Sequence, residues 1–328
     1  MNRKIGLAEI AKGEAGLSRA VELLAKGEAV ALPTETVYGL AADATNGEAV
    51  AKIFEAKGRP RFNPLIVHVA DMKMAADIAI FDSLSRKLAA TFWPGPLTIV
   101  LPLRIGHKLH PLVSAGLDTV GLRMPDGLAH EVIARLDRPL AAPSANSSGR
   151  ISATSAAAVE ADLGSKIPLV LDGGQTPVGV ESTIVKIEDG MVRLLRPGGV
   201  AAEDIEAVVN TPLLRTASGK VEAPGMLASH YAPAAAVRLD ATALMPGEAL
   251  LGFGSFSISG SPLATRNLSP TGNLREAAAN LFSHLAELDA SGASTIAVTP
   301  IPKHGLGEAI NDRLSRAAAP RDNPAVAK

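Results

Sequence analysis

Apolar positions along the chain follow two alternating periods. Residues 17–24 carry leucine and valine at helical spacing and predict a first amphipathic helix that ends at Gly27. Residues 30–32 then form a short apolar run that Pro33 stops, because proline has no N–H to donate to a sheet. This alternation of strand and helix is typical of an α/β fold.

The same two patterns continue through most of the sequence. Apolar runs predict strands at residues 65–69, 97–101, 119–125, 169–171, 182–187, 191–195 and 295–298, and near Val237 and Leu250. Helical spacing predicts helices at 46–57, 72–80, 83–92, 127–136, 273–288 and 307–318, with Asn46 as the N-cap of the first of these and Gly58 near its end. The turn Asp189-Gly190 predicts a hairpin between the two strands that flank it.

A change in composition divides the chain. Residues 211–235 are rich in proline, glycine and small residues without a period, which is typical of a linker. We therefore expect a larger domain at 1–210, a linker at 211–235 and a smaller βα-type domain at 236–328.

The first candidate site follows the strand that Pro33 stops. Thr34, Glu35, Thr36 and Tyr38 bring three hydroxyls and a carboxylate into five positions, and such groups are costly to bury without partners. Loops at the carboxyl ends of strands are where open α/β sheets bind ligands. His68 lies inside the next predicted strand; it could be a core histidine, but we expect it to emerge at the same edge of the sheet.

Cations form the second group of candidates. Lys57, Arg59 and Arg61 lie at the end of a helix, where cations also suit the helix dipole without any ligand. Arg123 interrupts an apolar strand and is expected to face either an anionic ligand or an acidic partner. Arg196 ends a strand beside a glycine turn, and residues 144–149 form a turn of small donors that could bind phosphate, although such turns are often only structural.

Composition excludes several classes of function. With 328 residues, 47% of them hydrophobic, the chain can form two folded domains, and a formal net charge of −1 argues against a general nucleic-acid surface. Aromatic residues make up 3% of the chain, so stacking platforms for RNA are scarce. The absence of cysteine excludes disulfides, thiolate metal sites and a cysteine nucleophile. No signal peptide or membrane span is evident, so a cytoplasmic location is expected.

Together, these motifs resemble the threonylcarbamoyl-AMP synthase family in its long form, in which a YrdC-type catalytic domain precedes a linker and a smaller C-terminal domain. The resemblance rests on PTETVYGL at 33–40, KGRP at 57–60, NPLIVHV at 63–69, WPGP at 93–96, PSAN at 143–146, ESTI at 181–184, RPG at 196–198, PGM at 224–226 and HYAP at 230–233. Each motif is weak alone, but their number and order make the match specific.

The resemblance implies a twisted open α/β sheet with a large cavity, followed by a Rossmann-like C-terminal domain. It implies a nucleotidyltransferase that makes threonylcarbamoyl-AMP, pyrophosphate and water from L-threonine, bicarbonate and ATP, with Mg²⁺ accompanying the ATP. This is the first step of N6-threonylcarbamoyladenosine formation in tRNA. The implied partner is the tRNA threonylcarbamoyl transferase machinery, which would receive the product, while direct tRNA binding stays open.

The resemblance also implies roles for particular residues. Those that would hold the ATP phosphates are Lys57, Arg59, Arg123, Ser144, Asn146 and Arg196, with Lys57 and Arg59 as the catalytic cations. Those that would bind threonine or shape its pocket are Thr34, Thr36, Tyr38, His68 and Ser182. Tyr231 in the linker would act as a lid, and Arg61-Phe62 departs from the small and acidic residues that many relatives carry there.

Two other functions stay open at this point. A YrdC-like surface could bind RNA without catalysis, although the low net charge and few aromatics disfavour this. A related enzyme could instead form a carbamoyl-adenylate from carbamoyl phosphate for metal-cofactor maturation. Relatives of that kind carry cysteine zinc motifs and further domains, and this chain has no cysteine.

Overall fold

The computed structural model describes residues 7–215, 222–225 and 229–320, and its contacts divide the chain into two compact units. The larger unit comprises Met1–Ser148 and Ser152–Met226, and the smaller unit comprises Gly149–Ile151 and Leu227–Lys328. The predicted linker 211–235 includes the change from one unit to the other. Its residues 216–221 and 226–228 lie outside the described part of the chain.

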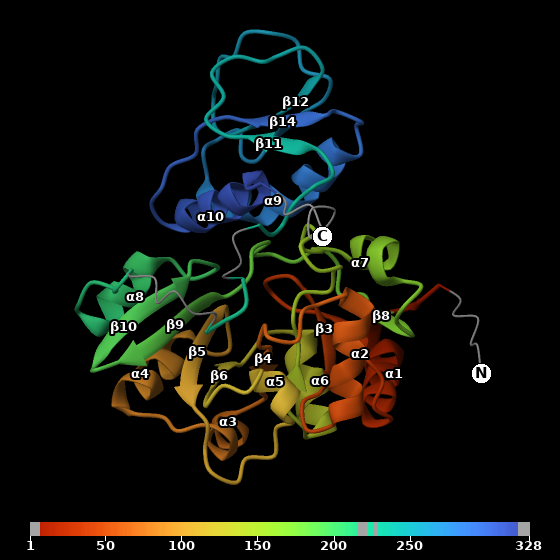
Figure 1. Ribbon diagram of the computed structural model, residues 1–328, viewed down its shortest axis with the longest axis vertical. Helices are drawn as coiled ribbons and strands as arrows, with labels where there is room; N and C mark the ends of the chain where they lie inside the picture. Colours follow the sequence, from red (N-terminus) through yellow and green to blue (C-terminus); the bar gives the residue numbers. More distant parts are fainter. Residues whose placement is uncertain (1–6, 216–221, 226–228, 321–328) are drawn as a thin grey trace, which may run out of the picture. The chain divides into compact units, whose positions relative to one another are not determined.

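Ten strands in the described residues form the sheet of the larger unit, in the order β1-β8-β2-β3-β7-β4-β6-β5-β9-β10 (Figure 1). The strands are β1 (Glu9–Ala11), β2 (Val30–Pro33), β3 (Tyr38–Asp43), β4 (Ile66–His68), β5 (Leu97–Pro102), β6 (Thr119–Arg123), β7 (Leu140–Ala141), β8 (Leu169–Leu171), β9 (Thr183–Glu188) and β10 (Met191–Arg196). The predicted α/β class is confirmed.

The helices of this unit are α1 (Gly13–Ala25), α2 (Gly47–Lys57), α3 (Met72–Ile78), α4 (Ser83–Phe92), α5 (Pro111–Ser114), α6 (Leu128–Leu136), α7 (Ala156–Leu163) and α8 (Ala202–Val209). The predicted N-cap of α2 is confirmed, since the Asn46 side chain accepts from the N–H groups of Glu48 and Ala49. The same helix ends at Gly58, whose φ of 60° is left-handed and therefore suits glycine.

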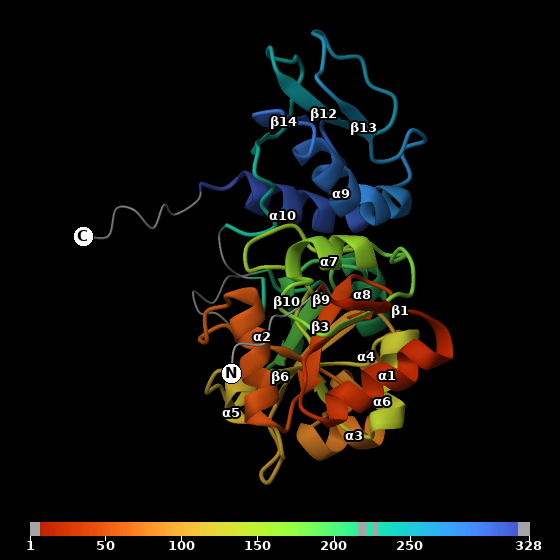
Figure 2. The ribbon, with the colours of Figure 1, turned by 90° about the vertical axis from the view of Figure 1, so that its right-hand side faces the viewer.

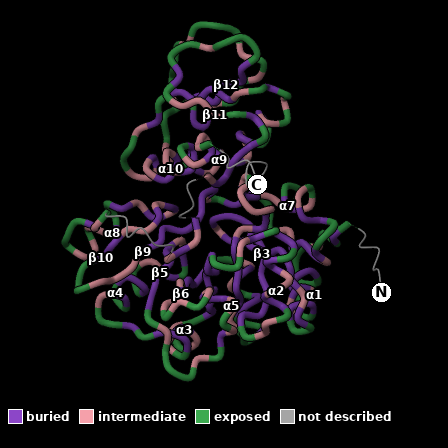
Figure 3. The backbone as a smooth tube through the Cα atoms, in the orientation of Figure 1, coloured by how far each residue is buried: buried purple, intermediate pink, exposed green. Residues whose placement is uncertain are grey.

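Strand alternation sends neighbouring side chains into different cores. Val30 and Leu32 of β2 pack with α1 and α6, which lie side by side in Figure 2, whereas Ala31 between them packs in the cluster that contains Val50 and Ile53 of α2. Helices therefore cover both faces of this half of the sheet. Figure 3 shows buried and exposed residues following one another along the described parts of the chain.

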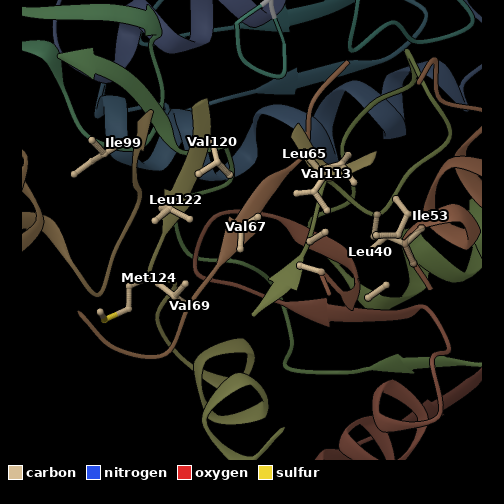
Figure 4. Packing of buried hydrophobic residues seen from close by; sticks show 14 of the residues in the cluster. Leu40, Ile53, Leu65, Val67, Val69, Ile99, Val113, Val120, Leu122 and Met124 are labelled. Atoms are coloured by element: carbon tan, nitrogen blue, oxygen red, sulfur yellow. The ribbon is translucent and has the colours of Figure 1, made fainter. Parts of the chain in front are cut away.

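The other half of the sheet is covered differently on its two faces. Val67, Ile99 and Leu122 point into the main core, where Figure 4 shows them packed together. On the opposite face, Ile66, Val100 and Ile184 cluster with Ala223, which belongs to the segment 222–225, and no described helix contributes to that cluster. We call this second face, with His68, Thr98 and Arg123 among its strand residues, the linker-covered face.

The sheet of the larger unit is mixed. Along the order of strands, β2 is antiparallel to β3, β3 to β7, and β7 to β4, so β4 runs opposite to β2. Glu35 of the loop after Pro33 nevertheless lies 2.6 Å from Arg123, the residue paired with His68, so His68 and this loop lie near each other as expected. The sequence analysis expected the loop after Pro33 to lead to a helix. That loop is instead the turn of a hairpin between β2 and β3, and the sequence analysis missed β3 because its alanine and glycine residues have weak strand propensity.

The predicted hairpin near Asp189-Gly190 is confirmed. β9 and β10 pair antiparallel, and both turn residues have positive φ, as the mirror-image hairpin turn requires. β9 also pairs with β5 in parallel, so this hairpin extends the sheet at its last edge.

The smaller unit has a parallel sheet of four strands in its described residues, in the order β11-β14-β12-β13. Its elements are β11 (Ala236–Arg238), β12 (Glu248–Gly252), β13 (Thr265–Asn267), α9 (Leu274–Asp289), β14 (Thr295–Val298) and α10 (Leu306–Ala318). Figure 1 shows both helices on one side of this sheet. The predicted stripe of α9, which includes Leu281 and Leu285, is buried. In the described parts of both units, no helix has the length and apolar character needed to cross a bilayer.

Candidate active site

The hairpin loop between β2 and β3 is closed by its own hydroxyls. The Thr34 Oγ1 donates to the carbonyl of Val37 at 2.6 Å and lies 2.8 Å from the Thr36 Oγ1. It also accepts from the backbone N–H groups of Thr36 and Val37. Both threonines are buried, so the two predicted hydroxyls occupy fixed positions in the loop.

Glu35 of this loop joins it to the linker-covered face. Its carboxylate lies 2.6 Å from the guanidinium of Arg123, which is 4% exposed and also donates to the carbonyl of Gly95. The sequence left an anion and an acidic partner open for Arg123, and the structure shows the acidic partner. The backbone N–H of Asp126 donates to the other oxygen of Glu35 and fixes the carboxylate.

Arg123 lies beside His68 in the paired strands β4 and β6. Burial, and then the positive charge of Arg123, hold the pKa of His68 well below its usual value. The imidazole is therefore neutral near pH 7 and can both donate and accept a hydrogen bond. Arg123 was expected to bind phosphate. The structure places it beside His68, one of the residues expected to bind the substrate threonine.

Ser182 and Arg196 meet at the start of β9. The Ser182 Oγ lies 2.8 Å from the Oγ1 of Thr98, and Arg196 donates to the carbonyl and hydroxyl of Ser182. Arg196 also donates to the carbonyl of Pro224, in the segment that covers this face. A predicted phosphate ligand and a predicted threonine ligand are therefore in direct contact.

Lys57 ends α2 and is almost completely enclosed. Its ammonium donates to the carbonyl of Ser144 at 2.6 Å and to the carbonyl of Asn146, while its own carbonyl accepts from the N–H of Ser148. The lysine motif and the Ser-x-Asn turn, far apart in the sequence, form one structure. An ammonium has three N–H groups, and the two carbonyls accept from two of them.

The charge of Lys57 is opposed by its surroundings. Burial, followed by the nearby charge of Arg59, holds the pKa of Lys57 well below its usual value, whereas Asp162 and Glu181 raise it. Glu181 immediately precedes Ser182, so the lysine group and the linker-covered face meet at these two residues. An added anion would favour the charged form of Lys57 further.

Arg59 folds back over its own loop. Its guanidinium donates to the carbonyl of Pro64 at 2.9 Å and more weakly to that of Asn63. The neighbouring side chains of Arg61 and Phe62 are exposed. The loop is thus fixed by a buried arginine at residue 59 and open to solvent at residues 61 and 62.

Two predicted aromatic residues lie apart from these contacts. The Tyr38 hydroxyl donates to the carbonyl of Gly174 and accepts from the N–H of Gly173, which places it against the loop after β8. Tyr231 belongs to the smaller unit, where its ring packs near Phe282 and 5.0 Å from the guanidinium carbon of Arg313. The lid role of Tyr231 stays a prediction.

The sequence analysis missed two residues that hold the site together, Thr98 and Asp162. Thr98 shares a face of β5 with Val100, and its hydroxyl inside the apolar run 97–101 is the sequence signal for it. Asp162 lies on α7, which the analysis did not predict, and its carboxylate accepts from the backbone and side chain of Ser147.

A large cavity of the larger unit lies away from the predicted site residues. A cavity of about 730 Å³ near α3 includes Asp71, Arg104, Lys108 and Arg138 in its lining, but none of the predicted site residues. A much smaller space lies between the linker-covered face and residues 222–224. Within the described ranges, no group of three or more His, Asp or Glu side chains could hold a metal ion.

The fold and the site together define a class of protein. Enclosed cations, fixed hydroxyls and a neutral imidazole lie in one α/β unit that is built on a mixed sheet. The family model described as "Telomere recombination" matches residues 22–198. A second model, described as "Threonylcarbamoyl-AMP synthase, C-terminal domain", matches residues 200–319.

Full-length relatives agree with both models. The threonylcarbamoyl-AMP synthase of Bacillus subtilis is 39% identical over 95% of this chain and 96% of its own length, and that of Pyrococcus abyssi is 40% identical over 92% and 94%. The crystal structure of P. abyssi Sua5 complexed with L-threonine superposes with a TM-score of 0.87 at 36% identity, covering 95% of this chain and 98% of that one. The chain belongs to the threonylcarbamoyl-AMP synthase family, as the motifs predicted.

Tyr38 provides a test of the loop geometry. Burial of its phenol raises the pKa of Tyr38 to about 12, so the folded state keeps the proton while an unfolded tyrosine loses it near pH 10. The contribution of the Tyr38 phenol to the free energy of unfolding is fully present below pH 10 and is lost as the pH rises toward 12. Tyr38→Phe should cost about 1 kcal/mol at pH 8, from the lost hydrogen bonds, and should reduce the further loss above pH 10.

Urea unfolding of wild type and variant between pH 8 and 11 measures both effects. The chain has two tyrosines, so Tyr231→Phe is the matched control and should leave the alkaline slope of the larger unit unchanged. An identical slope in Tyr38→Phe and wild type would show that the phenol is not held as described.

Proposed function

We infer that this protein makes threonylcarbamoyl-AMP from L-threonine, bicarbonate and ATP, as a nucleotidyltransferase. The observation that carries the proposal is the meeting of two groups in one unit. The enclosed ammonium of Lys57 has a donor left for a phosphate, and the linker-covered face of the same unit offers hydroxyls and a neutral imidazole. P. abyssi Sua5, which was crystallised with L-threonine, matches this chain over nearly its whole length.

The chemistry explains why such groups are needed. The threonine amine and bicarbonate condense to a carbamate with loss of water, and a carbamate oxygen then attacks the α-phosphorus of ATP. The bond from the α-phosphorus to the bridging oxygen breaks, and pyrophosphate leaves with that electron pair. Negative charge grows at the attacked phosphorus and on the leaving group, so fixed cations are the largest source of rate enhancement available.

We assign the cations and the Ser-x-Asn turn to ATP. Lys57 and Arg59 act as the catalytic cations, Ser144 and Asn146 form the turn that receives the phosphates, and Arg196 adds charge from the other side. Arg123 was expected to help here, but its position beside His68 also suits the carboxylate of an amino acid. No step requires a covalent intermediate with the protein.

We assign the loop and the linker-covered face to threonine. Thr34, His68 and Ser182 provide hydroxyls and an imidazole for the polar groups of threonine. Because His68 is neutral, it can accept a hydrogen bond without repelling the amine. Thr36 and Tyr38 fix the shape of this end of the pocket through the contacts of the hairpin loop.

Magnesium and partners complete the proposal. Mg²⁺ would arrive as the chelate of ATP, since its preferred ligands are phosphate oxygens and water and the described side chains form no cage of carboxylates. The unstable product would pass, in the cytoplasm, to the transferase that modifies tRNA. Tyr231 would act as a lid from the linker.

An amino-acid panel tests the reaction. We expect pyrophosphate release from ATP and Mg²⁺ to require bicarbonate and to be fastest with threonine. Serine, which lacks the methyl group, is the informative control, because one methyl group in a pocket is worth roughly tenfold or more. ATP left intact with every amino acid, together with salt-dependent tRNA binding, would instead support the RNA-binding alternative.

Lys57→Ala tests the assignment of the phosphate site. If Lys57 stabilises the charge that develops in the reaction, the variant should lose a factor of about 10² or more in pyrophosphate release. Lys73→Ala is the control, since Lys73 is an exposed lysine of α3 outside the site. Full activity in Lys57→Ala, with wild-type unfolding behaviour, would rule out its catalytic role.

Tyr231→Ala tests the lid. A lid predicts impaired turnover from loss of the ring, but the ring also packs near Phe282 in the smaller unit. Phe282→Ala disturbs the same packing without changing the linker, so it is the matched control. Slow turnover in Tyr231→Ala alone supports the lid, whereas equal losses in both variants assign the effect to packing.

A further inference from the structure

We propose that Asp162 is a positioning residue for the nucleotide site, which it serves by holding the turn whose carbonyls receive the Lys57 ammonium. The proposal rests on the function inferred above and extends it to a residue outside the motifs. Among the described residues, Asp162 contacts none of those assigned to ATP or to threonine. It acts through Ser147, which directly follows the turn of Ser144 and Asn146.

The first support is a pair of short hydrogen bonds. One oxygen of Asp162 accepts from the backbone N–H of Ser147 at 2.6 Å, and the other accepts from the Ser147 hydroxyl at 2.5 Å. The Ser147 carbonyl in turn accepts from the side-chain amide of Asn146 at 2.8 Å. A carboxylate with both oxygens in use, on neighbouring donors of one residue, restrains both the position and the orientation of a turn.

The second support is the place of Asp162 on its helix. It is the second-to-last residue of α7, where its negative charge opposes the helix dipole and lowers helix stability. Local helix formation therefore does not explain an aspartate at this position. The contact with Ser147, fifteen residues earlier in the chain, provides a reason for it.

The third support is electrostatic. Charged groups that act on Lys57 are Arg59, which follows α2, Asp162 on α7, Lys166 in the loop after α7, and Glu181 before β9. Arg59 and Lys166 lower the pKa of Lys57, and Asp162 and Glu181 raise it. Asp162 therefore favours the charged form of the ammonium as well as the position of its acceptors, and a phosphate site needs both.

Two substitutions separate these effects. Asp162→Asn keeps the shape of the side chain but removes its charge. Ser147→Ala removes the hydroxyl bond to Asp162 and the long contact from Lys166 at 3.5 Å, and it leaves the charge and the backbone bond. Glu160→Gln on the same helix is the control for loss of a carboxylate that has no contact with Ser147 in the described structure. Thermal unfolding of each variant shows whether it folds.

The first readout is the titration of Lys57 without any ligand, measured by NMR on protein with ¹³C-labelled lysine and assigned with Lys57→Arg. We expect Asp162→Asn to lower the pKa of Lys57, and Ser147→Ala and Glu160→Gln to leave it near the wild-type value. An unchanged Lys57 titration in folded Asp162→Asn overturns the electrostatic part of the proposal. This readout does not depend on catalysis, so it stands apart from the test of the reaction.

The second readout is ATP affinity, measured by calorimetry from pH 6 to pH 10. Asp162→Asn should weaken binding about tenfold or more, as loss of a charge-assisted hydrogen bond implies, and should move the alkaline loss of binding to lower pH. Ser147→Ala should weaken binding without moving that loss. If Ser147→Ala and Asp162→Asn both bind ATP like wild type, the positioning role is wrong. Wild-type protein that binds no ATP would contradict the proposed function instead.

Discussion

The site depends on the ammonium of Lys57 between two backbone carbonyls. Enclosing a charge of this kind costs several kcal/mol unless hydrogen bonds and opposite charges compensate. The carbonyls of Ser144 and Asn146 provide the hydrogen bonds, and Asp162 and Glu181 provide the charge. These groups come from the Ser-x-Asn turn, from α7 and from the residues before β9. One buried lysine at the end of α2 therefore requires that all four segments be in place.

A second constraint comes from the two faces of the sheet. On β4, β5 and β6, alternation sends Val67, Ile99 and Leu122 into the main core and places His68, Thr98 and Arg123 on the opposite face. The apolar residues of that face cluster with Ala223 of the segment 222–225 rather than with a helix. A short segment covers less of the sheet than a packed helix does. Polar side chains on this face can therefore lie close to a ligand, whereas a packed helix would exclude that ligand. On this face the fold thus carries buried polar side chains in place of part of its apolar core.

Sequence reasoning predicted much of this and missed parts for identifiable reasons. Strong periodicity predicted α2 and α9, and the Asp189-Gly190 turn predicted the β9–β10 hairpin correctly. By contrast, β3 and α7 are rich in alanine, which fits helix, strand and core alike, so their pattern was weak. The antiparallel direction of β4 relative to β2 depends on pairings across the whole sheet, which no local pattern encodes.

For the site, too, the sequence predicted one part and missed another. The motifs predicted residues whose particular partners the sequence did not identify: Arg123 pairs with Glu35, Lys57 with two carbonyls, and Arg196 with Ser182. A cation inside an apolar run is recognisable in the sequence, because burying its charge costs free energy. Its partner lies far along the chain and is brought to it only by folding. Tyr231 illustrates the limit, since its motif predicted a lid while its ring packs near Phe282 and Arg313 in the smaller unit.

The most direct test of this account follows the carbon of bicarbonate. Purified protein is incubated with ATP, Mg²⁺, L-threonine and ¹³C-bicarbonate, and the nucleotide products are analysed by mass spectrometry. The account predicts a threonylcarbamoyl-AMP that carries one labelled carbon, formed together with pyrophosphate. An adenylate without the label, or no adenylate at all, would contradict the assignment of the site to carbamate formation and adenylyl transfer.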